Sequence, residues 1–156
     1  MNDHWKSLLE VKKGDIGEDI IIDYLNKKGF AVYAPSYSKP HWIDIFATRN
    51  KNELYAIDVK TKARFNKWNA QGFDYNDYES YKRLQNLYKL KVFIFFIDDK
   101  NGNIHCADLN KLSEGFRIKN IIAWNLSEMK LIHTLSQKQI QQLTKYDNRT
   151  HDYKPK

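Results

Sequence analysis

The chain has 156 residues, of which 42% are hydrophobic and 29% are charged. This length allows one domain with a sizeable core, and the composition excludes an intrinsically disordered chain. The formal net charge of +7 favours an anionic partner, which is more commonly nucleic acid than an anionic membrane surface.

The number of cysteines and the hydropathy of the chain exclude further classes of protein. Cys106 is the single cysteine, so an intramolecular disulfide and a cysteine-rich zinc site are excluded, and its strand-like surroundings favour a small buried thiol over a nucleophile. No apolar stretch approaches the ~20 residues of a membrane-spanning helix, and the N-terminus lacks the apolar region of a signal peptide. We therefore expect a soluble, intracellular, cytoplasmic protein without a membrane partner.

The first predicted element is a helix over residues 15–28, with Asp15 as its N-cap and Gly29 after its end. Glu18 stands at the N-terminal end of the stripe that should face the core, because apolar residues follow it at helical spacing: Ile21, Ile22 and Leu25. Glu18 also follows Asp15 by three residues, so a capping box is an alternative interpretation.

Three strands are expected next, over residues 30–34, 42–48 and 53–62. Asp44 interrupts the apolar run of the second strand, and a polar hairpin turn leads into the third. In the third strand, alternation places Tyr55, Ile57 and Val59 on one face and Ala56, Asp58 and Lys60 on the other. A carboxylate and an ammonium therefore share one face of a strand that should be buried.

Residues 63–73 mix basic and aromatic side chains without a clear period. Asn76 and Glu79 have capping-box spacing and predict the start of a second helix. Residues 92–97 are apolar on both faces and predict a central strand, and a turn at Asn101-Gly102 leads to a strand over residues 104–107.

The C-terminal part shows weaker signals. Residues 121–124 predict a short strand, and Ser136 with Gln139 predicts a capping box before a helix that ends near residue 145. We interpret residues 1–146 as a single domain with a core over about 12–108 and an elaboration over 109–146. Residues 147–156 are expected to form a mobile basic tail.

Three carboxylates break the local patterns, namely Glu18, Asp44 and Asp58. Asp44 and Asp58 lie on consecutive strands, and carboxylates held close together repel unless a proton or a cation lies between them. Oxygen ligands of this kind suit Mg²⁺ or Mn²⁺. Lys60 beside such a site would stabilise negative charge developing on phosphorus or orient an attacking water.

Each residue also has a simpler interpretation. Asp44 could cap a bulge or pair with Lys39 or Arg49 at the surface, and Asp58 with Lys60 could be an ion pair on an edge strand. His41, just before the Asp44 strand, could be an ordinary loop histidine. The order and element types of the carboxylates together favour a metal-dependent phosphodiester site over these alternatives.

At these residues the chain resembles the PD-(D/E)XK nuclease superfamily. The resemblance covers residues 12–98 and rests on the first-helix Gly-x-x-Gly-Glu18, on Gly29-Phe30, on Trp42-Ile43-Asp44-Ile45 and on Ile57-Asp58-Val59-Lys60. The layout is most similar to small archaeal-type Holliday junction resolvases and related phage and restriction-like endonucleases. Ile43 replaces the proline usually written before the first aspartate.

The resemblance implies a restriction-endonuclease-like α/β fold, a mixed central sheet flanked by helices, in the order α-β-β-β-α-β-β plus the C-terminal elaboration. It implies a catalytic set of Glu18, Asp44, Asp58 and Lys60. The metal, Mg²⁺ with Mn²⁺ as a substitute, would be held by Asp44, Asp58, the Val59 carbonyl and Glu18.

Residues after Lys60 favour nucleic acid independently of the resemblance. Lys62, Arg64 and Lys67 could contact phosphates. The aromatic residues Trp68, Phe65 and Phe73 could stack on unpaired bases or fold back as a lid on the core.

We expect a Mg²⁺-dependent DNA endonuclease that acts on branched or duplex DNA. Its cutting should depend on DNA structure, as in a Holliday junction resolvase. A homodimer is expected, because cutting two strands needs two sites. The rival hypotheses are a catalytically inactive nucleic-acid-binding module and a protein-interaction subunit with the same fold.

Overall fold

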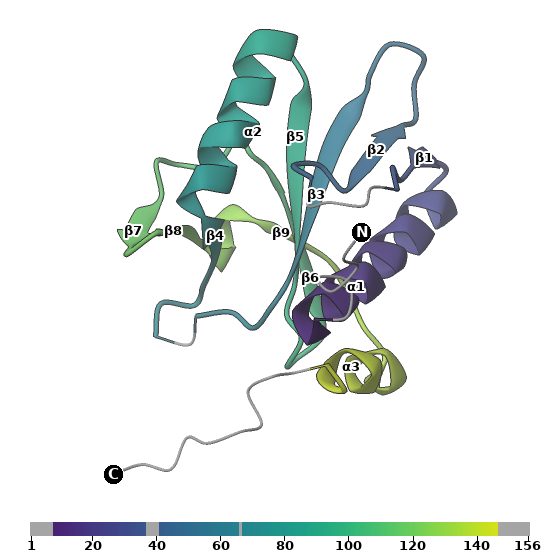
Figure 1. The fold of residues 1–156 in the computed structure, drawn as a ribbon, viewed down its shortest axis with the longest axis vertical. Coiled ribbons are helices and arrows are strands. Elements are labelled where there is room, and N and C mark those ends of the chain that lie inside the picture. The colour runs from purple at the N-terminus through teal and green to yellow at the C-terminus, as the bar shows by residue number, and fades with distance from the viewer. Residues whose placement is uncertain (1–7, 37–40, 66, 147–156) are drawn as a thin grey trace.

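The fold centres on a mixed six-stranded sheet, seen in a computed structural model that describes residues 8–36, 41–65 and 67–146 (Figure 1). Its strands are arranged in the order β1-β2-β3-β5-β6-β9. The neighbours β3 and β5 are parallel, and the other neighbouring pairs are antiparallel. The strand bounds are β1 Ala31–Tyr33, β2 Ile45–Thr48, β3 Tyr55–Thr61, β5 Lys91–Ile97, β6 Asn103–Asp108 and β9 Lys130–Thr134.

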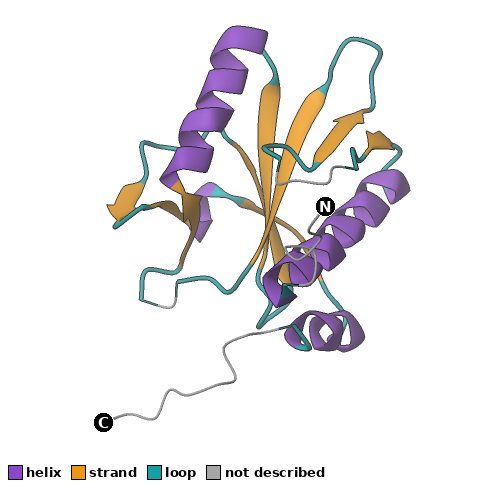
Figure 2. Ribbon diagram, viewed as in Figure 1, coloured by secondary structure: helices purple, strands orange, loops and turns teal. Residues whose placement is uncertain are grey.

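A second, three-stranded sheet has the order β4-β8-β7 and lies beside helix α2 (Figure 2). Its strands are β4 (Ala70–Asp74), β8 (Ile121–Asn125) and β7 (Phe116–Ile118), and the short 3₁₀ helix η2 (Leu126–Glu128) follows β8. The α-helices are α1 (Leu9–Lys27), α2 (Tyr75–Tyr88) and α3 (Gln137–Thr144). Figure 1 shows α1 and α2 on opposite sides of the central strands, so the expected mixed sheet with flanking helices is confirmed.

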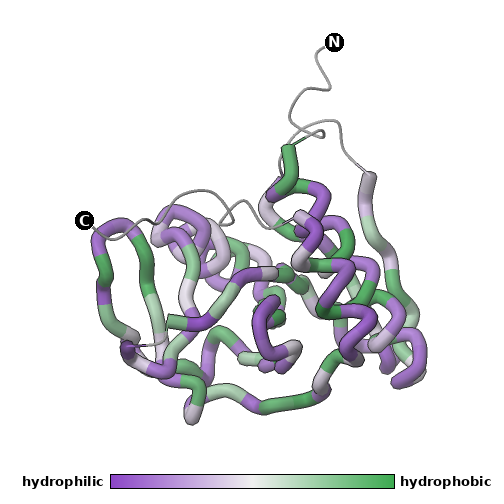
Figure 3. Tube along the Cα trace, turned by 90° about the horizontal axis from the view of Figure 1, so that it is seen from below, coloured by the Kyte–Doolittle hydropathy of each residue, from purple (hydrophilic) through white to green (hydrophobic). Residues whose placement is uncertain are grey.

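Each face of the main sheet covers its own hydrophobic core. On one face, Ile57 and Val59 of β3 pack with Ile21 and Leu25 of α1. On the other face lie Ala56, Val92, Ile94 and Phe96 with residues of α2 and of the second sheet: Tyr81, Phe73, Ile122 and Trp124. Hydrophobic and hydrophilic residues are interspersed along the coloured part of the trace in Figure 3, as expected where each element buries only part of its surface.

Helix α1 begins at Leu9, six residues earlier than expected. Asp15 is therefore an interior helical residue, and the predicted N-cap and the capping box with Glu18 are wrong. The buried stripe explains the difference, because Lys13, Gly17, Ile21 and Leu25 recur every four residues and pack toward the sheet. Core packing thus extends the helix through Gly14, whose low helix propensity suggested a boundary.

Two other local predictions are corrected. Asp44 does not lie inside a strand, because β2 begins at Ile45 and Asp44 immediately precedes it. Helix α2 is capped by Asp74, whose side chain accepts from the Asn76 backbone N–H, so Asn76 is not the N-cap. The capping box of Ser136 and Gln139 at α3 is confirmed.

The C-terminal residues contribute to both sheets. The strand predicted over residues 121–124 is β8, whereas β4, β7 and β9 were not predicted from the sequence. Strand β9 pairs with β6 at the edge of the main sheet, and Leu143 of α3 joins the core beside α1. The predicted basic tail lies outside the described residues. None of the described helices combines the length and the apolar character needed to cross a membrane.

Candidate active site

The face of β3 that points toward α2 carries two charged residues in succession. Asp58 is buried, with 3% of its surface exposed, and its Oδ2 lies 3.0 Å from the Lys60 Nζ. The alternate residues Ile57 and Val59 belong to the core on the α1 side. The predicted alternation is therefore confirmed. The ion pair of Asp58 with Lys60, which was the alternative interpretation, is present, but its expected place on an edge strand is wrong, because β3 lies between β2 and β5.

Lys60 lies between two carboxylates. Its Nζ is 3.0 Å from Asp58 Oδ2 and 3.0 Å from Asp77 Oδ2 on α2. Burial lowers the pKa of the Lys60 ammonium, but the charges of Asp58 and Asp77 outweigh burial and raise this pKa above its ordinary value. Lys60 is therefore a fixed cation at neutral pH.

Asp44 extends the pairing between β2 and β3 with its side chain. Its backbone N–H donates to Ile57 O at 3.1 Å, and its Oδ2 accepts from the Val59 N–H at 2.7 Å. The N–H and C=O of a strand residue point toward the same neighbour, so the Val59 carbonyl also faces the β2 side, beyond the first residue of β2. Burial, followed by the charges of Asp58 and Glu18, raises the pKa of Asp44 to about 9.

Glu18 approaches the same region from α1. Gly17 brings this helix close to β3, because a Cβ at Gly17 would lie 1.9 Å from the Thr61 Oγ1. Burial raises the pKa of Glu18 to about 7, with additional contributions from Asp15 and Asp58. The structure thus brings Glu18, Asp44, Asp58 and Lys60 within electrostatic reach of one another.

Two residues of α2 belong to this cluster and were missed in the sequence. Asp77 pairs with Lys60, and the Tyr81 ring lies 5.8 Å from the Lys60 Nζ. Burial, followed by the charges of Asp58 and Asp77, raises the pKa of the Tyr81 hydroxyl, which therefore stays protonated. Asp77 and Tyr81 are four residues apart and share a helix face, which is the signal that could have identified them.

Among solved structures, the chain is similar to Hjc, a Holliday junction resolvase from the archaeal hyperthermophile Archaeoglobus fulgidus. The TM-score is 0.55 and the sequence identity is 15%, covering 74% of this chain and 90% of that chain. This chain has the fold of a Holliday junction resolvase. No protein-family model and no curated protein matches the sequence. At this identity the similarity is one of fold, and the chemistry of the site depends on the chain's own residues.

The carboxylates of this resolvase fold are close enough to repel one another, and a bound cation would relieve this repulsion. Burial is the largest cause of the raised pKa values of Glu18 and Asp44, and the charge of Asp58 raises both further. Asp58 Oδ2 is itself buried and has the Lys60 ammonium as its counter-charge. Within residues 8–36, 41–65 and 67–146, no three His, Cys, Asp or Glu side chains converge as a ready-made ligand cage. Mg²⁺ does not require such a cage, because it is commonly bound by one or two carboxylates plus waters and phosphate oxygens. The residues present therefore fit Mg²⁺ better than a metal that needs many protein ligands.

His41 and Lys62 border the cluster. The His41 Nδ1 lies 3.8 Å from Asp44 Oδ1 and 2.8 Å from the Ile43 carbonyl, so this histidine is packed beside the carboxylate. Burial, followed by the charge of Lys60, lowers the pKa of Lys62 to about 8. Lys62 thus continues the basic face of Lys60 but does not share its ion pairs.

The predicted basic and aromatic segment is partly exposed. Trp68 is 42% exposed, its ring lies 5.1 Å from the Lys67 Nζ, and it contacts Phe65 and Phe116. Phe73 is only 1% exposed and belongs to the core, so of the two interpretations the packing on the core holds for this residue and base stacking does not. Burial of Phe73 follows from β4, whose alternation turns this side chain toward the core beside Tyr81 and Trp124.

Proposed function

We propose that this protein is a metal-dependent DNA endonuclease that hydrolyses phosphodiester bonds. The observation that supports this best is the juxtaposition of Asp58 with Lys60 on β3 and Asp44 beside Val59, within the fold of a Holliday junction resolvase. A buried carboxylate cluster beside a fixed cation suits a reaction in which negative charge develops on phosphorus.

In this proposal, Asp44 and Asp58 would hold Mg²⁺ or Mn²⁺, with the Val59 carbonyl and Glu18 as further ligands, direct or through water. The metal, when bound, would lower the pKa of a coordinated water and neutralise phosphate charge. The Val59 N–H holds Asp44 in place through its 2.7 Å hydrogen bond, and the close approach at Gly17 brings Glu18 alongside.

Lys60 would stabilise charge rather than accept a proton. Its two ion pairs, each of 3.0 Å, keep it protonated at the pH where the reaction would occur. A protonated amine can donate a hydrogen bond to a phosphate oxygen, or to the attacking water while another group accepts the proton. Tyr81 and Asp77 would hold this ammonium in position from α2.

DNA would reach the site along the residues that follow β3. Lys62, Arg64 and Lys67 would contact phosphates without reading sequence, and exposed Trp68 would stack on an unpaired base. Both contacts favour branched DNA, which carries duplex arms and exposed bases at the branch. Cutting both strands of such a substrate would need two copies of this site, so we propose a homodimer as the active form.

The first test is cleavage of branched, linear duplex and single-stranded DNA with Mg²⁺ or Mn²⁺. We expect Asp58→Asn and Lys60→Gln each to lower the rate at least about a hundredfold, because each removes a group that acts on the transition state. Asp23→Asn, on the exposed side of α1, is the matched control and should keep the parent rate.

Binding distinguishes catalysis from a binding-only function. A nuclease should lose cleavage in EDTA while keeping salt-sensitive DNA binding. If Asp58→Asn and Lys60→Gln cut DNA as well as the parent, the assigned site is wrong. If the parent binds DNA but no substrate is cut with either metal, the chain is a binding module with this fold.

A further inference from the structure

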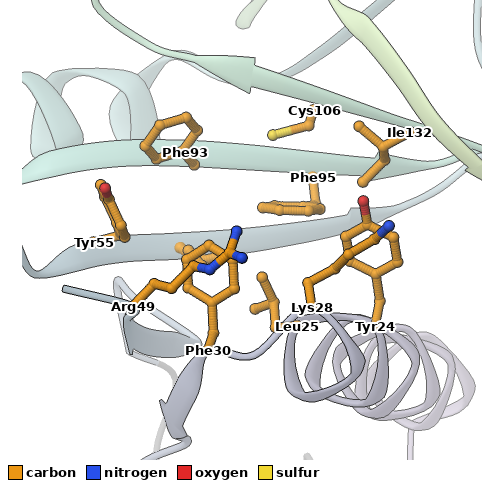
Figure 4. Close-up of a pocket in the computed structure, with 11 residues that line it drawn as sticks. Tyr24, Leu25, Lys28, Phe30, Arg49, Tyr55, Phe93, Phe95, Cys106 and Ile132 are labelled. Carbon is orange, nitrogen blue, oxygen red and sulfur yellow. The ribbon is translucent and has the colours of Figure 1, made fainter.

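A pocket of about 410 Å³ lies on the α1 side of the main sheet. It is lined by the buried residues Leu25, Ile57 and Phe95 and by half-buried aromatic side chains. Figure 4 shows these aromatic rings between α1 and the strands of the sheet. The lining comes from α1, the chain around β1 and β2, and the strands β3, β5, β6 and β9: Tyr24, Leu25, Lys28, Phe30, Arg49, Tyr55, Ile57, Phe93, Phe95, Cys106 and Ile132. This volume lies within the usual range of sites for small organic ligands, roughly 300–1,000 Å³.

The pocket is separate from the candidate active site. Ile57 faces the pocket, whereas its neighbour Asp58 faces α2 on the opposite side of the sheet. None of the residues assigned to the nuclease site lines it. Its occupant would therefore have to be recognised by a different chemistry.

Two cations at this pocket have no acidic partner within residues 8–36, 41–65 and 67–146. In Figure 4 the side chains of Lys28 and Arg49 reach toward the aromatic rings that line it. The Lys28 Nζ lies 5.6 Å from the centre of the Tyr24 ring, and the Arg49 guanidinium lies 5.9 Å from that of Phe30. Within the described residues, neither side chain forms an ion pair, and no acidic side chain lines the pocket.

A neighbouring lysine provides the contrast. The Lys91 Nζ lies 5.9 Å from the centre of the Tyr55 ring at the same pocket, but Glu53 neutralises it at 2.8 Å. Lys28 and Arg49 are thus the cations whose charge is available to a ligand. An apolar cavity with positive charge at its edge is complementary to a molecule with an apolar body and an anionic group.

We propose that this pocket binds a free amphipathic anion, a small molecule with a hydrocarbon or aromatic body and one carboxylate or phosphate. The body contacts Leu25, Phe93 and Phe95, and the anionic group pairs with Arg49 and Lys28. This binding is independent of the nuclease reaction and goes beyond the function proposed above.

The probes are 1-anilinonaphthalene-8-sulfonate, whose fluorescence rises in apolar surroundings, and laurate below its micelle concentration as competitor. We expect laurate to displace the fluorescent probe, and neutral 1-dodecanol to displace it about tenfold more weakly, because dodecanol lacks the charge that Lys28 and Arg49 recognise. Equal competition by laurate and dodecanol would overturn the proposal.

Charge variants test the two cations directly. Lys28→Gln and Arg49→Gln should each weaken laurate binding about threefold and together about tenfold, the size expected for exposed ion pairs. Lys27→Gln is the matched control, because Lys27 is the adjacent lysine on α1 and pairs with Asp23 at 2.5 Å. An unchanged affinity in the double variant, or an equal loss in the control, would refute the anion site.

A blocking variant locates the site. Ile132→Trp on β9 should fill the pocket and abolish both probe and laurate binding, with the circular dichroism spectrum unchanged. Probe binding that survives in a folded Ile132→Trp protein would place the site elsewhere and overturn the proposal. Probe binding that falls as the protein concentration rises, in parallel with dimer formation by sedimentation, would show that a second copy covers the pocket and would also overturn it.

Discussion

Asp77 is a carboxylate outside the predicted set that contacts Lys60, the proposed catalytic cation. It is one of two acidic partners of the Lys60 Nζ, and the other, Asp58, is itself a proposed metal ligand. When Asp58 engages a metal, Asp77 would remain to orient the ammonium. In the proposed nuclease Asp77 would therefore be a positioning residue, because it would act on the substrate only through Lys60.

We expect Asp77→Asn to lower kcat about tenfold and to leave KM for DNA nearly unchanged, since outer partners of this kind typically contribute ten- to a hundredfold. The pKa of Lys60 should fall, so the pH–rate profile should lose activity at a lower alkaline pH than in the parent. Glu79→Gln, on an exposed position of the same helix, should change neither quantity. An unaltered kcat and pH profile in Asp77→Asn would exclude the positioning role.

Gly17 has a steric role, because the absence of a side chain at this position lets α1 approach β3 closely. A Cβ at this position would lie 1.9 Å from the Thr61 Oγ1, so Gly17→Ala must displace either the helix or the threonine side chain. We expect a loss of stability of about 1–3 kcal/mol, the usual cost of overpacking, together with reduced cleavage because Glu18 moves with the helix.

Gly14 on the same helix is a close control for that substitution. Nothing lies within 4 Å of a Cβ placed there, so Gly14→Ala should stabilise the helix by about 0.5–1 kcal/mol through propensity alone. Denaturant unfolding of both variants gives the comparison. Equal stability changes at the two positions would contradict the close approach.

At the scale of elements, the sequence predicted the parts of the site that follow a strict period. The alternation in β3 placed Asp58 and Lys60 on one face, and the apolar run of β5 predicted its central position, since both patterns reflect burial within one strand. The chain order of Glu18 on α1, Asp44 just before β2 and Asp58 on β3 was sufficient to group them. Local pattern and tertiary packing agree at these positions.

Element boundaries and partners were less predictable, because other parts of the chain determine them. Helix α1 extends through Gly14 since Lys13 is buried against Asp99, which is 86 residues away. Strand β9 is mostly exposed, so its composition lacks the apolar alternation that predicts a strand, and its pairing with β6 defines it. Asp77 was not predicted as a site residue, because its partner Lys60 lies on another element.

Where α1, β2 and β3 come together, the raised pKa values of Glu18 and Asp44 predict how the stability of the fold depends on pH. The pKa of Glu18 is raised from 4.5 to about 7 and that of Asp44 from 3.8 to about 9. Both groups bind protons more tightly in the folded state, so the stability they contribute is complete below about pH 4 and is lost as pH rises through 7 and 9. In EDTA, the melting temperature should therefore contain a component that falls between pH 5 and pH 8.

Glu18→Gln and Asp44→Asn isolate this component, because each replaces a titrating group with a neutral amide. Each variant should flatten the fall in melting temperature. His105 has a lowered pKa and opposes the trend, and it remains present in all three proteins. Mg²⁺ should raise the melting temperature most at high pH, since the carboxylates then no longer need protons to relieve their repulsion. A parent and variants with identical pH slopes in EDTA would exclude coupling of the carboxylates.

The whole molecule, which has the fold of a Holliday junction resolvase, combines the main sheet with a second sheet that packs against the face carrying Asp58 and Lys60. The segment from β3 to β4 joins the two parts and carries Lys62, Arg64 and Lys67. Trp68 of this segment touches Phe116 of β7, so the chain leading out of the site also lies against the second sheet. The net charge of +7 and this placement make the segment the best-placed phosphate-binding surface beside the site.

The salt dependence of DNA binding measures how many phosphates this surface contacts. With EDTA present to prevent cleavage, log K for a branched DNA should fall linearly with log salt, and each lysine or arginine that contacts a phosphate should contribute about one to the slope. Lys67→Gln and Arg64→Gln should each reduce the slope by about one, and Trp68→Ala should weaken binding to single-stranded DNA more than binding to duplex DNA.

Lys138→Gln is the control. This residue lies on α3, a helix that packs with α1 on the opposite face of the main sheet, so the variant should leave the slope unchanged. Anisotropy titrations at several salt concentrations provide these slopes. Equal slopes for the parent, Lys67→Gln and Arg64→Gln would move the DNA path away from this segment, whereas loss of single-strand preference in Trp68→Ala alone would assign base stacking to the tryptophan.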